Sequence, residues 1–323
     1  MRSPLILGTR GSPLALAQAN HVKALVERAH TVEVRLETIH TTGDKITDMP
    51  LGQIGPAVGG AGGTKALFTK EIEEALLAGR IDLAVHSLKD LPVALPEGLA
   101  LAAIPAREDA RDALISRHGQ PLAKLPAGAR VGTSSLRRQL QLRLLRKDLV
   151  IEPLRGNLDT RLRKLDDGRY DAIVVALAGL KRMGWADRAT QVFSPEEMVP
   201  AIGQGALAIE IRKEDAELRA ALERLGDPDT ETCVTAERAF LARLGGGCQV
   251  PLAAHAQVKR ERLRLVGVVV SLDGARAVRG IEEGPQEDAP VLGVALAERL
   301  LKEGAREILA AIAESGLRPP GAA

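Results

Sequence analysis

Short apolar segments alternate with amphipathic ones along the first two thirds of the chain, and this alternation constrains the fold more than any other feature. LILG at 5–8 has the composition of a buried strand, and Ser12-Pro13 is an N-cap and first-turn pair that opens a helix reaching about Arg28. Strands joined by helices in this way form a mostly parallel sheet. The elements expected next are a strand at 32–36, a helix at 65–79 that ends in glycine, and strands at 81–88 and 99–104.

The pattern restarts after residues 105–112, a polar stretch consistent with a linker. Strands are expected at 129–132, 149–154, 170–177 and 205–212, with helices near 135–147 and 157–167. From about Asp227 the pattern changes to a helix at 229–244, a hairpin over 263–280 with its turn at Asp273-Gly274, and a long helix over 290–315. No internal repeat is evident in the sequence.

Composition excludes several classes of function. Aromatic residues make up only 2% of the chain and the net charge is +2, so neither a stacking platform for single-stranded nucleic acid nor a general electrostatic partner is expected. The two cysteines, Cys233 and Cys248, form no disulfide framework and lack metal-ligand spacing, which favours a reducing compartment. The first residues lack a signal-like apolar region and no run of about 18 apolar residues occurs, so a soluble cytoplasmic protein is expected.

The segment VGTSSLRRQ at 131–139 indicates an anion site. A strand ends at Gly132, Thr133, Ser134 and Ser135 offer hydroxyls, and Arg137 and Arg138 fall in the first turn of the next helix. Cations there oppose the helix dipole at a cost of about 0.3–1 kcal/mol each, unless an anion sits between them. Helix N-termini also bind anions through their N–H groups. The alternative is an exposed basic face of the helix.

The same arrangement recurs at other strand ends. Arg10 and Ser12 follow one strand, Ser87, Lys89 and Asp90 follow another, and Arg155 and Arg161 flank a third strand-to-helix turn. Because ligands of open α/β sheets bind at the carboxyl ends of strands, these residues predict a cleft for a multiply anionic ligand. Asp90 is an acid among bases; it could stabilise a developing cation, or it could be a loop carboxylate paired with a neighbour.

Three further residues carry reactive side chains. Two of them are expected to be structural, and the residues alone assign no role to the third. His86 lies within a strand and is expected to be a buried, hydrogen-bonded histidine. Cys233 sits on a helix and is expected to be a small core residue. Cys248 lies in GGGCQVP at 245–251, where three glycines exclude regular structure, and no histidine and acid are spaced to activate it as a nucleophile.

Taken in order, the segments of this chain resemble the porphobilinogen deaminase (hydroxymethylbilane synthase) family. The resemblance runs from about residue 5 to the Cys248 loop and continues more weakly to the C-terminus. It is carried by GTRGSPLALAQ, GDKITDMPL, LFTKEIEEALL, DLAVHSLKDLP, REDARDAL, VGTSSLRRQ, LRGNLDTRLRKL, YDAIVVALAGLKRMG, AIGQGALAIE and TAERAFLARLGGGCQVP.

The resemblance implies an α/β fold with two periplasmic-binding-protein-like lobes, each with a parallel-rich sheet, and a smaller α+β C-terminal domain with a three-stranded antiparallel sheet. Domain 1, the first cleft lobe, would comprise 1–105 with 205–226. Domain 2, the second lobe, would comprise 106–204, and domain 3, which carries the cofactor attachment, 227–323. The family suggests a monomer.

The resemblance also implies an activity. The enzyme would be a transferase that deaminates porphobilinogen and condenses four molecules head to tail on a dipyrromethane primer, releasing hydroxymethylbilane for tetrapyrrole and heme biosynthesis. The primer would be covalent, assembled from substrate, and attached to Cys248 by a thioether. Asp90 matches the family's catalytic aspartate. No metal, nucleic acid or membrane is expected.

Other residues match family positions that contact the cofactor or the substrate. Those matched to the cofactor, besides Cys248 and Asp90, are Ser12, Lys89, Thr133, Ser134, Ser135, Arg137, Arg138, Arg155, Gly156 and Gln204. Those matched to the substrate are Arg10, Ser12, Gln18, Ser87, Arg155, Arg161 and Arg182.

One segment differs from the family pattern. Family members have a short loop ending in Gly-Gly-Lys-Gly, whereas this chain has a longer stretch with six glycines in residues 51–64, which is typical of a flexible lid or a disordered segment. Lys65 and Phe68 are aligned with the family's lid residues.

Two other functions compete with this one. A non-catalytic anion receptor of the periplasmic type fits two lobes but leaves the loop cysteine without a role. A nucleic-acid binder using RRQLQLRLLRK at 137–147 conflicts with the low net charge.

Overall fold

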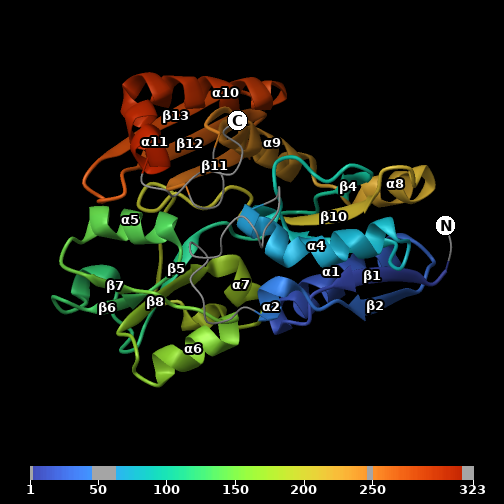
Figure 1. Ribbon diagram of the computed structural model, residues 1–323, viewed down its shortest axis with the longest axis horizontal. Helices are drawn as coiled ribbons and strands as arrows, with labels where there is room; N and C mark the ends of the chain where they lie inside the picture. The colour runs from blue at the N-terminus through green and yellow to red at the C-terminus, as the bar shows by residue number, and fades with distance from the viewer. Residues whose placement is uncertain (1–2, 46–62, 246–249, 315–323) are drawn as a thin grey trace. The chain divides into compact units, whose positions relative to one another are not determined.

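The computed structural model describes residues 3–45, 63–245 and 250–314 (Figure 1). The contacts within the chain divide it into two compact units, one comprising 1–108 and 206–231 and the other 109–205 and 232–323. The first unit is therefore discontinuous in sequence. The boundary lies within the stretch expected to be a linker, but Asp112, the last residue of that stretch, is fully buried at the start of a strand.

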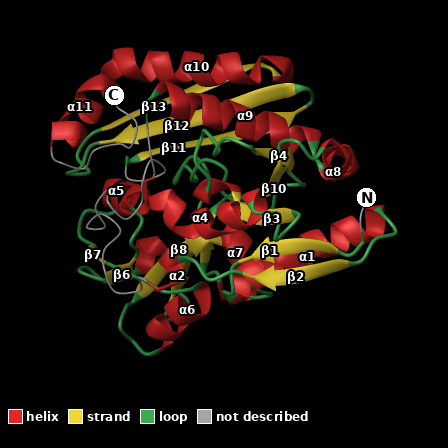
Figure 2. Cartoon of the chain, turned by 45° about the vertical axis from the view of Figure 1, so that its right-hand side comes forward, coloured by secondary structure: helices red, strands yellow, loops and turns green. Residues whose placement is uncertain are grey.

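The first unit contains one five-stranded sheet of order β2-β1-β3-β10-β4. The β1 strand pairs in parallel with β2 and β3, whereas β10 runs antiparallel to β3 and β4. Figure 2 shows helix α1 beside β1 and β2. The strands are β1 (Leu5–Thr9), β2 (Val34–Thr38), β3 (Leu83–Ser87), β4 (Leu99–Ala103) and β10 (Leu207–Arg212), and the helices are α1 (Pro13–Ala29), α2 (Thr42–Lys45), α4 (Gly63–Leu77), α8 (Ala216–Leu222) and the 3₁₀ turns η3 (Leu88–Asp90) and η6 (Glu223–Leu225).

The second unit begins with a sheet of the same plan. Its order is β7-β6-β8-β5-β9, with β6 parallel to β7 and β8, and β5 antiparallel to β8 and β9. The two sheets thus share strand order and direction, a topological repeat that the sequence did not reveal. The elements are β5 (Asp112–Ser116), β6 (Arg130–Gly132), β7 (Val150–Glu152), β8 (Ala172–Ala176), β9 (Gln191–Val192), α5 (Leu136–Leu145), α6 (Leu158–Asp166), α7 (Leu177–Arg182), η4 (Leu122–Lys124) and η5 (Ala186–Arg188).

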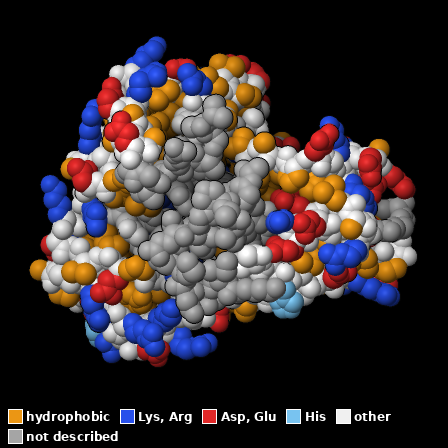
Figure 3. All heavy atoms as spheres, in the orientation of Figure 1, with side chains coloured by type: hydrophobic (Ala, Val, Ile, Leu, Met, Phe, Trp, Pro, Cys, Tyr) orange, Lys and Arg blue, Asp and Glu red, His pale blue; other side chains and the backbone are white. Residues whose placement is uncertain are grey.

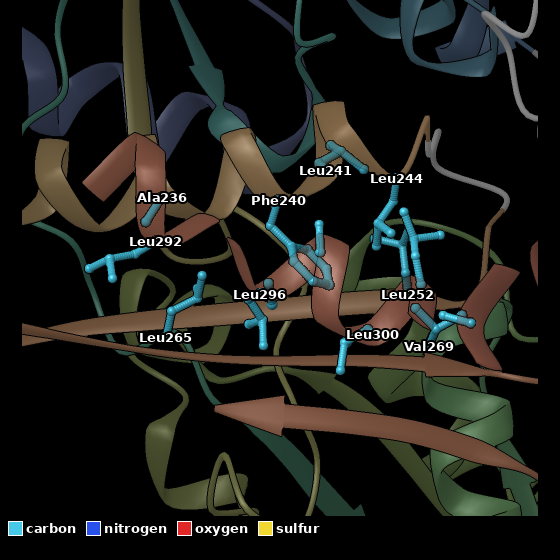
Figure 4. Packing of buried hydrophobic residues seen from close by; sticks show 14 of the residues in the cluster. Ala236, Phe240, Leu241, Leu244, Leu252, Leu265, Val269, Leu292, Leu296 and Leu300 are labelled. Carbon is cyan, nitrogen blue, oxygen red and sulfur yellow. The ribbon is translucent and has the colours of Figure 1, made fainter. Parts of the chain in front are cut away.

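The rest of the second unit is built on a three-stranded antiparallel sheet of order β11-β12-β13. Apolar residues of α9 and α10 cover one face of this sheet, and Phe240 and Leu296 lie at the centre of the cluster (Figure 4). The elements are α9 (Pro228–Arg243, which begins in the first unit), β11 (Leu252–Lys259), β12 (Arg262–Val270), β13 (Ala277–Pro285), η7 (Gln286–Asp288), α10 (Ala289–Leu300), the π-helical turn η8 (Leu301–Ala305) and α11 (Arg306–Glu314).

The long C-terminal helix expected over 290–315 is not continuous. Gly304 has φ +113°, a value outside helical geometry that side-chain-bearing residues rarely adopt, so the helix breaks between α10 and α11. The expected hairpin is present, with its turn at Asp273-Gly274. The predicted α/β class, with two parallel-rich sheets and a three-stranded antiparallel sheet, is confirmed. The three-domain division stays a prediction.

Candidate functional site

The first strand of the first unit leads directly into two candidate residues. Ser12 is the N-cap of α1: its backbone is extended (φ −69°, ψ 147°), its Oγ accepts a hydrogen bond from the Ala15 amide at 3.3 Å, and Pro13 follows in the first turn, as the sequence predicts. Arg10, between β1 and this cap, lies over the ring of Phe68 on α4, with its Cζ 4.4 Å from the ring centroid. A guanidinium at that distance is attracted by the electron-rich face of the ring. The side chain of Lys65 and all of residues 51–62 lie outside the described part of the chain.

The end of β3 carries the other candidate residues of this unit. Ser87 accepts a 3.0 Å hydrogen bond on its Oγ from the buried Gln18 amide of α1, which ties the two elements together. Lys89 and Asp90 follow in η3 and are both half-buried. No described residue forms an ion pair or hydrogen bond with the Asp90 carboxylate, so the alternative of a loop carboxylate paired with a neighbour finds no support in the described residues.

In the second unit, hydroxyl groups cluster where β6 ends. The Oγ of Ser134 donates to the Leu154 carbonyl at 2.9 Å, and the buried Thr133 hydroxyl accepts from the Ser135 amide at 3.2 Å. Ser135 is the N-cap residue of α5, but its side chain makes no capping hydrogen bond. These bonds fix the loop that leads into the helix.

Arg137 and Arg138 are buried and are not part of an exposed basic face. Both guanidiniums lie 2.7 Å from the carboxylate of Asp112, which is itself fully buried on β5. Burial alone would raise the pKa of Asp112, but the two guanidiniums hold it well below its usual range. The anion that the helix-dipole argument required is therefore supplied by the protein itself.

Gln204 joins this cluster from the loop before β10. Its Nε2 donates to Asp112 Oδ1 at 2.9 Å and to the Ala110 carbonyl at 2.7 Å. Arg182, at the end of α7, donates to the carbonyl of Gly205, the next residue of that loop, at 2.7 Å. The loop before β10 thus connects two predicted site residues, because Gln204 belongs to it and Arg182 binds the carbonyl of the residue that follows Gln204.

Arg155 and Arg161 flank the turn into α6. Gly156 makes the turn with φ +109°, and a Cβ there would lie 2.7 Å from the Thr160 methyl, so the position requires glycine. The Nε of Arg161 donates to the Gly156 carbonyl at 2.8 Å. Arg155 is half-buried, and burial lowers its pKa, yet no described carboxylate forms an ion pair with it.

Only one of the two cysteines, Cys233, lies in the described part of the chain. Cys233 is 6% exposed and packs in the cluster of α9 and the three-stranded sheet, which confirms its assignment as a core residue. Cys248 lies outside the described residues.

Sequence reasoning missed the acids that organise these regions. It placed Asp112 in a linker, because its arginine partners lie 25 and 26 positions further along the chain and no local pattern joins them. It identified His86 as a buried, hydrogen-bonded histidine, which is confirmed, but not its partner Glu210 at 3.0 Å.

The described residues contain neither a metal-binding cluster nor a membrane-spanning helix. No group of three or more His, Cys, Asp and Glu side chains in these ranges is arranged to hold a metal ion. No helix in them has the length and hydropathy needed to cross a bilayer. On the face drawn in Figure 3, basic and acidic side chains are interspersed and form no single basic patch outside the grey atoms.

Comparisons with known proteins agree over most of the chain. A family model described as porphobilinogen deaminase, dipyromethane cofactor binding domain, matches residues 5–220, and one described as porphobilinogen deaminase, C-terminal domain, matches residues 231–302. The chain is 51% identical over 304 residues to a porphobilinogen deaminase of Syntrophobacter fumaroxidans, covering 94% of this chain and 96% of that protein. It is 52% identical over 315 residues to one of Nitratidesulfovibrio vulgaris, covering 97% and 98%.

Among solved structures, the chain is similar to a periplasmic binding protein of Salmonella typhimurium with high arginine specificity. The two are 15% identical, with a TM-score of 0.39, over 72% of this chain and 94% of that one.

Proposed function

The chain belongs to the porphobilinogen deaminase family, and from this premise we propose which of its residues carry the activity. The enzyme is a transferase that deaminates porphobilinogen and condenses four molecules head to tail on a dipyrromethane cofactor. Each pyrrole of substrate and product carries an acetate and a propionate. The residues that hold the chain must therefore neutralise many carboxylates.

The state of Arg155 is the observation that best supports this proposal. A half-buried guanidinium without an internal acid is costly, and it is stabilised when a ligand brings a carboxylate to it. Gly156 and the Arg161–Gly156 hydrogen bond hold the loop on which Arg155 sits. A dipyrromethane side chain has the planar carboxylate that an arginine fork binds through two parallel hydrogen bonds. The donors present thus fit the cofactor.

The remaining carboxylates of the oligopyrrole would be bound by the other cations and hydroxyls at the strand ends. Arg137 and Arg138 contribute differently from Arg155, because Asp112 already accepts hydrogen bonds from both. With two guanidiniums and one carboxylate, that cluster retains one formal positive charge. The other residues in this proposal are Arg10, Ser12, Gln18, Ser87, Lys89, Thr133, Ser134, Ser135, Arg161, Arg182 and Gln204.

We assign the catalytic role to Asp90. Cleavage of the substrate's C–N bond releases ammonia and leaves a cationic pyrrole. A preorganised carboxylate beside that cation stabilises the charge as it develops. Asp90 is half-buried and has no competing partner among the described residues, so its negative charge is available to the substrate. When bound, the dipyrromethane supplies the free pyrrole carbon that forms the new C–C bond and loses a proton.

Cys248 is proposed to hold the cofactor by a thioether. The proposal rests on the resemblance of the GGGCQVP segment to the family and on the burial of Cys233, which makes that thiol poorly accessible. Phe68 and Lys65 are proposed as lid residues. We likewise propose a monomer, a cytoplasmic location and the three-domain division at the boundaries given above.

Ammonia release tests the activity directly. Purified protein incubated with porphobilinogen should release one ammonia for each porphobilinogen consumed and one hydroxymethylbilane for every four. Saturable binding of porphobilinogen without ammonia release would instead support the non-catalytic receptor.

A further inference from the structure

A layer of buried polar side chains lies between helix α4 and the sheet of the first unit, and none of its residues has been assigned to the site above. On β3 and β10, His86 lies opposite Ala208, and Glu210 lies opposite Ala84. Since side chains two apart share a face of a strand, His86 and Glu210 project from the same face of the sheet. The His86 Nε2 and the Glu210 Oε2 are 3.0 Å apart, and the two side chains are 4% and 0% exposed.

Helix α4 contributes a second buried carboxyl, that of Glu73, on the side of the helix that contacts β3 and β10. Thr69, Ile72, Glu73 and Leu76 are buried at helical spacing and form the face that packs on β3 and β10. Glu73 is therefore an acid on the apolar face of an amphipathic helix. Its Oε1 and the Oε1 of Glu210 are both buried and receive no hydrogen bond from any described residue.

The electrostatics of the layer do not balance if every group is ionised. Two carboxylates and one imidazolium would leave a net negative charge where water is excluded, which is strongly unfavourable. Burial raises the pKa of Glu73 and the negative charge of Glu210 raises it further, whereas the Thr69 hydroxyl and His86 lower it; the net direction is upward. A proton on Glu73 removes the excess charge and also supplies a donor to a layer that holds two unsatisfied carboxyl oxygens.

The other charged groups near Glu73 do not replace that proton. Glu74, next to it on α4, is exposed, pairs with Lys70 at 3.9 Å and adds to the rise in the Glu73 pKa. Asp82 directly precedes β3 and lies on the same face of the sheet as His86. It is 3.5 Å from Arg212 and accepts a hydrogen bond from the Ile6 amide. Among the described groups that act on Glu73, His86 is the only basic side chain.

We propose that Glu73 holds a proton over the Glu210–His86 pair, and that these three residues position the Ser87–Asp90 segment by fixing α4 on β3. The positioning part rests on the assignment of Asp90 above. His86 directly precedes Ser87, whose hydroxyl already meets Gln18, and η3 with Asp90 follows without a loop. On the other side, α4 carries Phe68, which contacts Arg10. The layer is thus connected to two parts of the proposed site, through β3 to the Ser87–Asp90 segment and through α4 to Phe68 and Arg10.

The first test needs no turnover. Infrared spectra of the holoenzyme labelled with ¹³C-glutamate should contain the C=O stretch of a protonated buried carboxylic acid near neutral pH. The band should be lost in Glu73→Gln and retained in Glu74→Gln, the exposed neighbour. Absence of the band in the wild type, or its survival in Glu73→Gln, would overturn the proposal whether or not the enzyme assignment is correct.

The second test separates positioning from stability. The folded protein favours neutral Glu73, so the stabilisation from this group is present below the ordinary pKa of 4.5 and is lost as pH rises through the raised value. In protein that stays folded, loss of the Glu73 proton would leave excess negative charge beside the pair that positions the Ser87–Asp90 segment. The kcat of the wild type should for this reason decline with rising pH, and the decline should be absent from Glu73→Gln and present in Glu74→Gln, all measured where circular dichroism shows folded protein.

A third variant tests the pair itself. Glu210→Gln removes the charge that holds His86 and should lower kcat by about 10–100-fold with little change in KM, because misplacement of a catalytic group slows the chemical step more than binding. Glu73→Gln, which keeps a neutral hydrogen-bonding side chain, should retain near wild-type kcat at neutral pH. Identical pH profiles in wild type and Glu73→Gln, or unchanged kcat in folded Glu210→Gln, would contradict the positioning role.

Discussion

The guanidinium of Arg138 and the carboxylate of Asp112 lie 2.7 Å apart in a site where the two side chains are 7% and 0% exposed. Arg137 contacts the second oxygen of the same carboxylate at 2.7 Å. A strand and the first turn of a helix are thus joined by one acid and two bases. Removing the acid would leave two buried cations facing each other.

We expect Asp112→Asn to destabilise the protein by about 3–5 kcal/mol at neutral pH, because breaking a buried pair leaves uncompensated charge. Urea unfolding measures this change. Asp148→Asn is the matched control, since Asp148 pairs with Arg146 at the surface, and its midpoint should change little.

The same cluster sets the direction of a pH effect. Because the pKa of Asp112 is depressed in the folded state, its stabilisation is present above the ordinary value of 3.8 and is lost as pH falls through the lower folded value. Unfolding midpoints measured from neutral pH into this acid range should fall more steeply in wild type than in Asp112→Asn. Parallel slopes would mean that Asp112 is not ionised in the folded protein.

Asp90→Asn keeps the size of the side chain but removes its charge. We expect kcat to fall by about 100–1,000-fold or more, as when one preorganised electrostatic group is removed from an active site. The covalent cofactor should remain, and intact mass separates this outcome from failed assembly. Asp187→Asn, an exposed acid on another 3₁₀ turn, is the control. Near-normal turnover by loaded Asp90→Asn would assign catalysis to a different group.

Arg155→Ala should weaken binding of the acidic chain. A charge-assisted hydrogen bond contributes about 1.5–3 kcal/mol, which corresponds to a loss of roughly 10–100-fold in affinity or in cofactor loading. Arg155→Lys keeps the charge without the planar fork, so its affinity and cofactor loading should lie between those of wild type and Arg155→Ala. Arg163→Ala, on the exposed face of α6 and 3.8 Å from Asp159, should behave as wild type. Equal KM and loading in Arg155→Ala and Arg163→Ala would remove Arg155 from the site.

How far the sequence determined these results depends on how local each interaction is. The Ser12 N-cap, the strand ends and the Asp273-Gly274 turn depend on residues close in sequence, so patterns and propensities predicted them. The Asp112–Arg138 pair spans 26 positions and the His86–Glu210 pair spans 124, and neither leaves a periodic signal. The shared plan of the two sheets also escaped detection, because β10 enters the first sheet after the whole second sheet has been formed along the chain.

Phe68→Leu tests the contact with Arg10. A cation over an aromatic face gains about 0.5–2 kcal/mol, so loss of the ring should raise KM by roughly 2–30-fold if Arg10 must be held in place for substrate. Phe68→Tyr keeps the aromatic face and should restore KM. If the leucine and tyrosine variants are equally impaired, packing of α4 and not the ring–guanidinium contact would account for the effect.

Intact-protein mass spectrometry of the two cysteine variants decides where the cofactor is attached. Wild type and Cys233→Ser, expressed in a host that makes porphobilinogen, should each be heavier than the chain by two pyrrole units and should give the coloured reaction of dipyrromethanes with acidic aldehyde reagent. Cys248→Ser should have the mass of the bare chain, because serine's hydroxyl is a far poorer nucleophile than a thiolate at neutral pH. Cys233 is 6% exposed in an apolar cluster, so its loss costs packing but no attachment site. An adduct retained in Cys248→Ser and lost in Cys233→Ser would move the attachment to α9.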